Sequence, residues 1–173
     1  HLDGKKLVST QEMVGKIQAA LDARASEETL IIARTDARAV EGFAQAIERA
    51  WAYKEAGADI LFVEAPQSLQ EMQHICAEFS AQIPLLANMV EGGKTPISSA
   101  SELAKLGYKI AIFPGGAVRA IAHHLQAYYT GLLTHGNNQK FSDKMHDFNG
   151  LNDLLGTKDL IELGRKYEDQ GNI

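Results

Sequence analysis

The chain of 173 residues has little of what marks several large classes of protein. Its one cysteine, Cys76, excludes an intrachain disulfide framework and favours a reducing compartment, for which we expect the cytoplasm. No apolar run approaches the roughly 18 residues of a membrane span, and no secretory signal sequence begins the chain. The net charge of −5 offers no basic surface, so we expect neither a nucleic-acid partner nor a membrane partner.

Several catalytic signatures are also missing. No glycine-rich phosphate-binding loop follows an apolar segment, and there is neither a Gly-x-Ser-x-Gly motif nor a Ser-His-Asp order. Cys76 falls in a helical pattern and is interpreted as a small buried hydrophobe rather than a nucleophile. Five histidines lack the spacing of metal ligands and are interpreted as structural or surface groups: His74, His123, His124, His135 and His146.

What the sequence does contain is a regular alternation of strand and helix. Strands are expected at about 29–35, 59–64, 83–89 and 109–113. Helices are expected at about 10–24, 43–56, 68–79, 98–105, 116–134 and 157–168. No two-residue hairpin turn joins the strands, which favours parallel strands with crossover helices in one domain over residues 1–173. A small open doubly wound sheet and half of an eight-stranded barrel both fit this pattern.

The strands end in polar side chains, and parallel α/β folds place their sites at the carboxyl ends of strands. Arg34 lies in an apolar stretch, where it needs an anion, and its planar fork binds a carboxylate or phosphate through two hydrogen bonds. Asp36 could orient Arg34 or accept a proton. A carboxylate at Glu64 is costly unless it is paired or near a metal, so a functional role and a structural pair with Arg34 both stay open. Asn88 offers donors and acceptors, with turn capping as the alternative.

Two further features follow the third and fourth strands. The polar loop 91–96 could close over a ligand, or it could be an ordinary solvated loop. Arg119 begins the helix after the fourth strand, where it could bind a second anionic group or lie on the surface. The whole set suits an anionic, oxygen-rich substrate.

Three runs carry a resemblance to a known family: 31–37 (IIARTDA), 62–66 (FVEAP) and 86–96 (LANMVEGGKTP). In this order they closely resemble the isocitrate lyase / phosphoenolpyruvate mutase superfamily, nearest to the branch of methylisocitrate lyase, dimethylmalate lyase and carboxyphosphonoenolpyruvate phosphonomutase. The resemblance implies an α/β fold of the (β/α)8 TIM-barrel type, in which this chain is the C-terminal half with strands five to eight. It also implies the N-terminal half of the barrel as a partner, and a homotetramer in which the helix at 159–167 swaps onto a neighbouring subunit.

The same resemblance implies roles for individual residues. Arg34 would hold a substrate carboxylate, Asn88 would grip a second one, and Arg119 would also contact the substrate. Glu64 would help to organise Mg²⁺ and its waters, with Mn²⁺ as a possible substitute. His1 resembles the histidine that closes the mobile Lys-Lys/Arg-Cys-Gly-His loop, whose cysteine is the general acid–base in lyase members; a tag remnant is the alternative for His1.

One departure from the family pattern bears on the substrate. Methylisocitrate lyases carry an arginine in the segment that corresponds to 149–154, where this chain has Leu151. This difference favours a smaller substrate, such as a substituted malate or oxaloacetate.

The sequence thus predicts a magnesium-dependent carbon–carbon lyase that acts on a small 2-hydroxy or 2-oxo dicarboxylate through an enolate. The alternatives are carbon–phosphorus chemistry of the phosphoenolpyruvate mutase or phosphonomutase type, decarboxylation or hydrolysis of oxaloacetate, and an anion-binding protein without metal. Because half a barrel has open strand edges, we expect the chain alone to aggregate.

Overall fold

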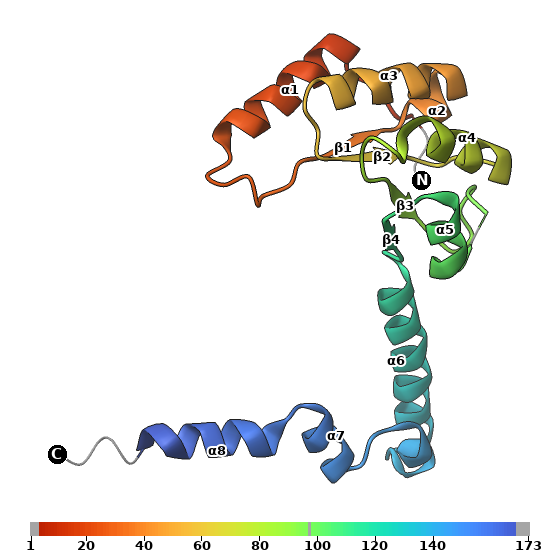
Figure 1. Ribbon diagram of the computed structural model, residues 1–173. Coiled ribbons are helices and arrows are strands. Elements are labelled where there is room, and N and C mark those ends of the chain that lie inside the picture. Colours follow the sequence, from red (N-terminus) through yellow and green to blue (C-terminus); the bar gives the residue numbers. More distant parts are fainter. Residues whose placement is uncertain (1–3, 97, 169–173) are drawn as a thin grey trace. The chain divides into compact units, whose positions relative to one another are not determined.

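The computed structural model describes residues 4–96 and 98–168 of the chain, and its elements are labelled in Figure 1. The chain divides into two compact units, His1–Ala117 and Val118–Ile173, each of which is described by itself. The first contains all the strands of the described residues. The prediction of one domain over 1–173 stays a prediction.

The first unit is built on four short parallel strands. They are β1 (Ile32–Thr35), β2 (Ile60–Val63), β3 (Leu86–Asn88) and β4 (Ile110–Ile112). β1 pairs with β2 in a register that places Arg34 opposite Phe62, and β3 pairs with β4. A parallel bridge between Leu61 and Leu85 joins the two pairs, so the spatial order follows the chain order. The strands lie where the sequence predicts them, with fewer residues at their ends.

Helices connect successive strands, as the alternating pattern predicts. They are α1 (Thr10–Ala23) before β1, α2 (Ala37–Val40) and α3 (Phe43–Glu55) between β1 and β2, α4 (Leu69–Phe79) before β3, and α5 (Ala100–Leu106) before β4. Ser9, Ser68 and Ser99 cap α1, α4 and α5 by accepting the backbone N–H three residues later. Among these helices of the first unit, only α2, a single turn after β1, lies outside the predicted helices.

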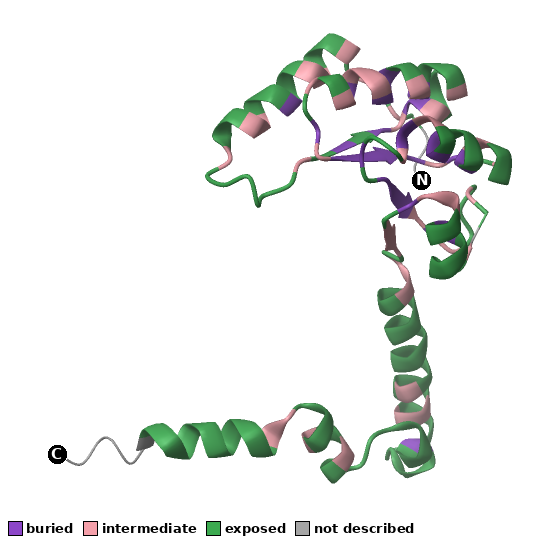
Figure 2. Cartoon of the chain, viewed as in Figure 1, coloured by how far each residue is buried: buried purple, intermediate pink, exposed green. Residues whose placement is uncertain are grey.

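Alternation along the strands gives the sheet two different faces. The main core forms on one face, where buried side chains of the helices pack against those of the strands. The strand residues of this core include Ala33, Leu61 and Leu85. The second face carries a smaller apolar cluster around Phe62. Figure 2 shows the buried residues concentrated in the strands and on the inner sides of the helices. Because side chains alternate with a period of two, the polar residues at the strand ends continue the second face.

The second unit is entirely helical in the described residues. It holds most of α6 (Gly116–His135), then η1 (Gln139–Lys144), α7 (Phe148–Leu154) and α8 (Thr157–Glu168). α6 and α8 correspond to the helices predicted at 116–134 and 157–168, whereas η1 and α7 lie between them, where no helix was predicted. Phe141 packs edge to face against His124 and Tyr128. Among the described residues of this unit, it is the one that is buried. No helix in the described part of the chain is long and apolar enough to cross a membrane.

Candidate active site at the carboxyl ends of the strands

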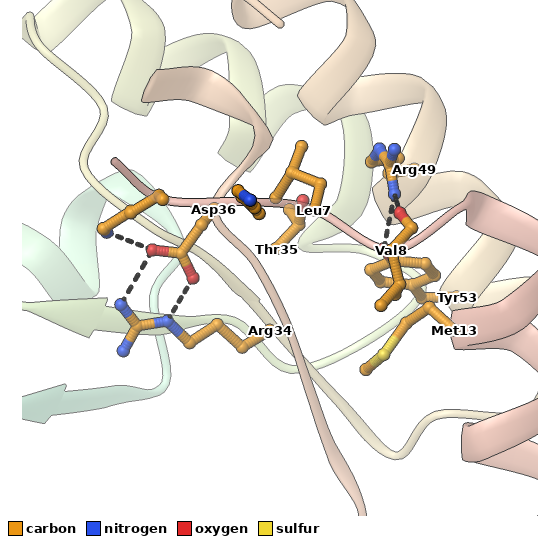
Figure 3. Close-up of a pocket in the computed structure, with 10 residues that line it drawn as sticks. Leu7, Val8, Met13, Arg34, Thr35, Asp36, Arg49 and Tyr53 are labelled. Atoms are coloured by element: carbon orange, nitrogen blue, oxygen red, sulfur yellow. Dashed lines mark hydrogen bonds and ion pairs between the residues drawn. The ribbon is translucent and has the colours of Figure 1, made fainter. Parts of the chain in front are cut away.

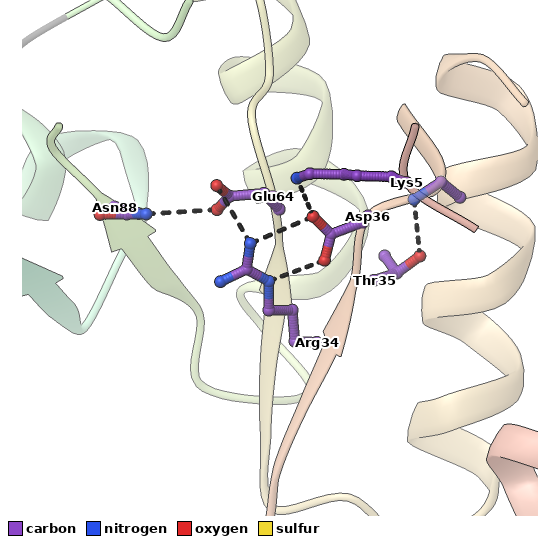
Figure 4. A network of polar contacts seen from close by, with 7 residues as sticks. Lys5, Arg34, Thr35, Asp36, Glu64 and Asn88 are labelled. Carbon is purple, nitrogen blue, oxygen red and sulfur yellow. Dashed lines mark hydrogen bonds and ion pairs between the residues drawn. The ribbon is translucent and has the colours of Figure 1, made fainter. Parts of the chain in front are cut away.

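Three of the predicted site residues come from adjacent strands and meet at one edge of the sheet. Arg34 is the third residue of β1, Glu64 directly follows β2, and Asn88 is the last residue of β3. The backbone N–H of Glu64 donates to the carbonyl of Thr35 at 3.0 Å, which continues the ladder by one residue. Figure 4 shows the three side chains pointing toward one another, with Asp36 and Lys5 beside them.

Arg34 is at the centre of this group. Its Nε donates to Asp36 Oδ2 at 2.8 Å and its Nη2 donates to Asp36 Oδ1 at 3.1 Å, which is a two-pronged ion pair. The same Nη2 lies 3.2 Å from Glu64 Oε1, and the guanidinium carbon lies 4.8 Å from the centroid of the Phe62 ring. The side chain is nevertheless 44% exposed, so its cation is held in place and still open to an incoming anion.

Glu64 is the most deeply buried charge of the group, with a side chain only 4% exposed. Its Oε1 pairs with Arg34, and its Oε2 accepts a hydrogen bond from Asn88 Nδ2 at 3.3 Å. A buried carboxylate is costly unless such partners satisfy it, so the structural pair with Arg34 left open by the sequence is present. Asn88 Oδ1 is buried with no hydrogen-bond partner among the described residues, which leaves one acceptor for a ligand or a water.

The backbone after Glu64 is strained. Ala65 has a φ of 57°, in the left-handed region that residues other than glycine and asparagine seldom adopt. The turn that follows is held by Glu71, which accepts from the Gln67 backbone N–H at 2.7 Å and from Arg38 at 2.7 and 3.0 Å. Arg38 lies on α2, so this clamp links the segment after β1 with the segment after β2.

The charges of the site are stabilised by one another. Burial by itself would raise the pKa of Asp36, but hydrogen bonds from Arg34 and Lys5 outweigh it and hold that pKa below its usual value. The hydrogen bond to Asp36 and the charge of Glu64 raise the pKa of Arg34 against the opposing effect of burial. At neutral pH the pair is therefore fully ionised.

An open pocket of about 410 Å³ adjoins Arg34 and Asp36. Figure 3 shows Leu7, Val8, Met13 and Tyr53 among its lining residues. The volume lies in the range of small-molecule sites, and the combination of apolar walls with a few charged groups is typical of them. The arrangement can bind a small anion and orient it.

Comparison with known proteins gives this geometry a context. Residues 1–133 match the family model of phosphoenolpyruvate phosphomutase. The 2,3-dimethylmalate lyase of Eubacterium barkeri is 42% identical over 169 residues, which are 96% of this chain and 57% of that protein. The chain belongs to the phosphoenolpyruvate mutase / isocitrate lyase superfamily.

Further members of the superfamily agree with this. The 2-methylisocitrate lyase of Aeropyrum pernix is 43% identical over 173 residues, covering 98% of this chain and 55% of that protein. A crystal structure of 2,3-dimethylmalate lyase superposes with a TM-score of 0.85 and 32% identity over 94% of this chain and 57% of the other. The superfamily prediction is thus confirmed. The chain spans about half the length of the relatives it matches.

The predicted site residues of this superfamily member have different outcomes. Arg34, Glu64 and Asn88 lie together at the ends of adjacent strands, and their predicted binding roles stay predictions. Arg119 lies on α6 in the second unit, so its predicted contact with the substrate stays a prediction. His1 lies outside the described residues. Cys76 is buried in α4, and burial raises the pKa of its thiol to about 11, which agrees with its interpretation as a structural residue.

Sequence reasoning missed two cations near the site. Lys5 binds Asp36, and no local pattern in its polar segment distinguishes it from Lys6. Arg49 is buried and forms a two-pronged pair with Glu41 at 2.8 and 2.9 Å. Arg49 could have been found, because it shares the helical face of Ala46 and Ala50, where an isolated charge needs a partner.

The predicted magnesium can be compared with the donors present. Among the described residues, no cluster of three His, Cys, Asp or Glu side chains could hold a metal ion. The Glu64 carboxylate and the unsatisfied Asn88 Oδ1 are oxygen donors of the kind that Mg²⁺ and its waters prefer. Glu64 fits its predicted role of organising Mg²⁺ and its waters, because Mg²⁺ keeps several waters and is usually bound through only one or two carboxylates.

Proposed function

We propose that the chain forms the C-terminal half of the barrel of a magnesium-dependent carbon–carbon lyase that acts on a small 2-hydroxy or 2-oxo dicarboxylate. The observation that carries the proposal is the Arg34 cation, which Asp36 and Glu64 fix in place and which stays 44% exposed beside a pocket. Identity of 42% with a 2,3-dimethylmalate lyase supports the class of reaction.

Each residue of the group has a distinct part in this proposal. Arg34 binds one carboxylate of the substrate with the exposed side of its guanidinium, while Phe62 packs against the plane of the fork. Glu64 is buried and orients both Arg34 and Asn88. Asn88 then presents Oδ1 to a hydroxyl donor of the substrate or to a water. Fixing the substrate in this way reduces the entropy lost on reaching the transition state.

The remaining parts of the reaction are assigned by resemblance. Mg²⁺, when bound, would supply Lewis-acid stabilisation of the negative charge that develops on the 2-oxo oxygen. We assign the proton transfer to the cysteine of the loop that His1 would close. We assign the second carboxylate to Arg119 and to Nδ2 of Asn88, which has a second hydrogen besides the one donated to Glu64. Leu151, on α7, supports a substituted malate over a tricarboxylate as substrate.

The assembly proposed is a barrel completed by an N-terminal half, in a homotetramer with a swapped terminal helix. Each strand pair is parallel, and the second face of the sheet carries an apolar cluster of the kind that fills a barrel. The helix α8 exposes several large apolar residues, which is what a swapped helix needs before it finds its neighbour: Leu160, Ile161, Leu163 and Tyr167.

The experiment is an assay of the complete enzyme with Mg²⁺ on 2,3-dimethylmalate, 2-methylisocitrate, oxaloacetate and a phosphonate, with products identified by mass spectrometry. We expect cleavage of the substituted malate in preference to the tricarboxylate, and loss of activity on chelation. Cleavage of the carbon–phosphorus bond alone would favour the mutase alternative. Binding of these acids without any turnover or Mg²⁺ dependence would favour an anion-binding protein and contradict the lyase.

A further inference from the structure

The segment before α1 is fastened to the site at two points. Lys5 forms an ion pair with Asp36 Oδ1, and the Val8 carbonyl accepts a hydrogen bond from the buried Arg49 at 2.9 Å. Leu7, between them, packs against the main core. The Lys5 side chain is 28% exposed, so the ammonium group is held beside Asp36 rather than extended into solvent. Figure 4 shows the end of the Lys5 side chain beside the Asp36 carboxylate, which Arg34 also contacts.

Asp36 is shared between two cations. Its Oδ1 accepts from Lys5 and from Arg34 Nη2, while its Oδ2 accepts from Arg34 Nε. Within the described network, Lys5 and Arg34 balance the carboxylates of Asp36 and Glu64. Without Lys5, two carboxylates would face a single cation, and the group would carry one net negative charge toward an anionic substrate.

We propose that Lys5 is a positioning residue for the carboxylate-binding arginine and that it acts through Asp36. By taking part of the charge of Asp36, Lys5 leaves more of the Arg34 cation for the substrate and keeps the group electrically neutral. This inference rests on the proposed function only in the identity of the anion, because the balance of charge applies to any small dicarboxylate that Arg34 binds.

The test uses the complete enzyme and malate, a simple 2-hydroxy dicarboxylate, with binding measured by isothermal titration calorimetry. Removing a unit charge from a half-buried site should raise the Kd for malate about tenfold in Lys5→Met. The matched control is Lys16→Met, which removes a lysine from an exposed ion pair with Glu12 on α1. We expect this control to leave the Kd within about twofold, as exposed pairs contribute little.

Three further measurements separate positioning from a merely structural role. Lys5→Arg keeps the charge and should restore most of the affinity. In an Asp36→Asn background, Lys5→Met should change the Kd by less than about twofold, because a residue that acts through Asp36 has no effect without it. On the cleaved substrate, Lys5→Met should raise KM while kcat stays within about twofold.

The outcomes distinguish this inference from the proposed function. Two results would overturn the role of Lys5 even if the enzyme is a lyase. The first is that Lys5→Met binds malate as tightly as the unmodified enzyme. The second is that Lys5→Met weakens malate binding in the Asp36→Asn background by the same factor as in the unmodified enzyme. Loss of affinity in an enzyme that cleaves no diacid would uphold Lys5 and refute the lyase. If Lys5→Met does not fold, Lys5→Gln takes its place, because it removes the charge and keeps a polar end group. The same changes in Kd and KM are then expected.

Discussion

At the residue scale, the chemistry of this site depends on one arginine, Arg34, near the end of a largely apolar segment. Arg34 holds Asp36 with two hydrogen bonds and also pairs with Glu64, which only a planar fork with several donors can do at once. The sequence predicted the need for an anion, because an unpaired charge among apolar residues is costly. The sequence could not say which carboxylate would pair with Arg34. Only in the folded chain do Asp36 and Glu64 both lie within ion-pair distance of its guanidinium.

The first prediction concerns Arg34→Lys in the complete enzyme. An ammonium is a point charge that cannot hold Asp36 and a substrate carboxylate in the same geometry, so kcat/KM should fall roughly ten- to a hundredfold, mainly through KM. Steady-state kinetics measure the change. The control is Arg24→Lys, which alters an arginine paired with Asp59 just before β2 and should leave KM unchanged. Equal effects of the two substitutions would contradict a substrate-binding role for Arg34.

The second prediction concerns the strained residue after Glu64. With a φ of 57°, Ala65 is in a conformation that β-branched residues adopt at high cost. Ala65→Val should therefore destabilise the fold by about 1–2 kcal/mol, whereas Ala65→Gly should be tolerated. Urea unfolding of both variants measures the difference. A valine variant as stable as the glycine variant would show that the turn relaxes without cost.

At the element scale, the helices of the first unit follow from serine caps and apolar periodicity. α1, α4 and α5 each begin after a serine that accepts the N–H three residues on, and the sequence predicted all three. α2, η1 and α7 have only four to seven residues, which is too few turns to show a clear period, and they were missed. The equally short α5 was predicted because serines precede it. The missed α2 carries Arg38, so the clamp on Glu71 was missed with it.

The third prediction tests that clamp through pH. Burial by itself would raise the pKa of Glu71, but hydrogen bonds from Arg38 and the Gln67 backbone outweigh it and lower the pKa. A lowered folded pKa means that the ionised group stabilises the fold above its unfolded pKa of about 4.3. This stabilisation is lost as the pH falls from there through the folded pKa.

Glu71→Gln should therefore lower the free energy of unfolding by about 1–3 kcal/mol at pH 7 and reduce its fall between pH 5 and pH 3. Thermal unfolding monitored by circular dichroism across this range provides the measurement. Glu55→Gln, in an exposed pair with Lys54, serves as the control and should have little effect. An unchanged pH dependence in Glu71→Gln would show that the clamp contributes no stability.

At the scale of the whole molecule, much apolar surface is left without a partner. Among the described residues, β1 pairs with β2 only, so its other edge is open, and Leu30 and Ile32 on this strand and its approach are about half exposed. The helical second unit exposes more, including Leu133 and Phe148, and has a single buried residue in its described part. Surface of this kind is what the proposed N-terminal half of the barrel and the neighbouring subunits would cover.

The fourth prediction is that residues 1–173 expressed alone self-associate. Open strand edges and exposed apolar faces favour aggregation, so we expect high-mass species in light scattering and strong binding of a hydrophobic dye. Co-expression with an N-terminal half of the barrel should reduce both signals. A soluble monomer that melts cooperatively, without the N-terminal half, would contradict the half-barrel proposal.

The sequence by itself determined the strands, most of the helices and the residue types at the strand ends. Buried strands need apolar, β-branched residues and amphipathic helices need a period of 3.6, so both patterns are written locally. Only the tertiary structure decided which side chains meet. Asn88 lies 24 positions from Glu64 and meets it because the segment leading into β3 pairs with β2. Lys5 lies 31 positions from Asp36 and meets it because the segment before α1 packs against the first unit and is held there by Arg49. Local pattern fixes which residues end a strand, whereas packing and pairing between strands fix which charges share a site.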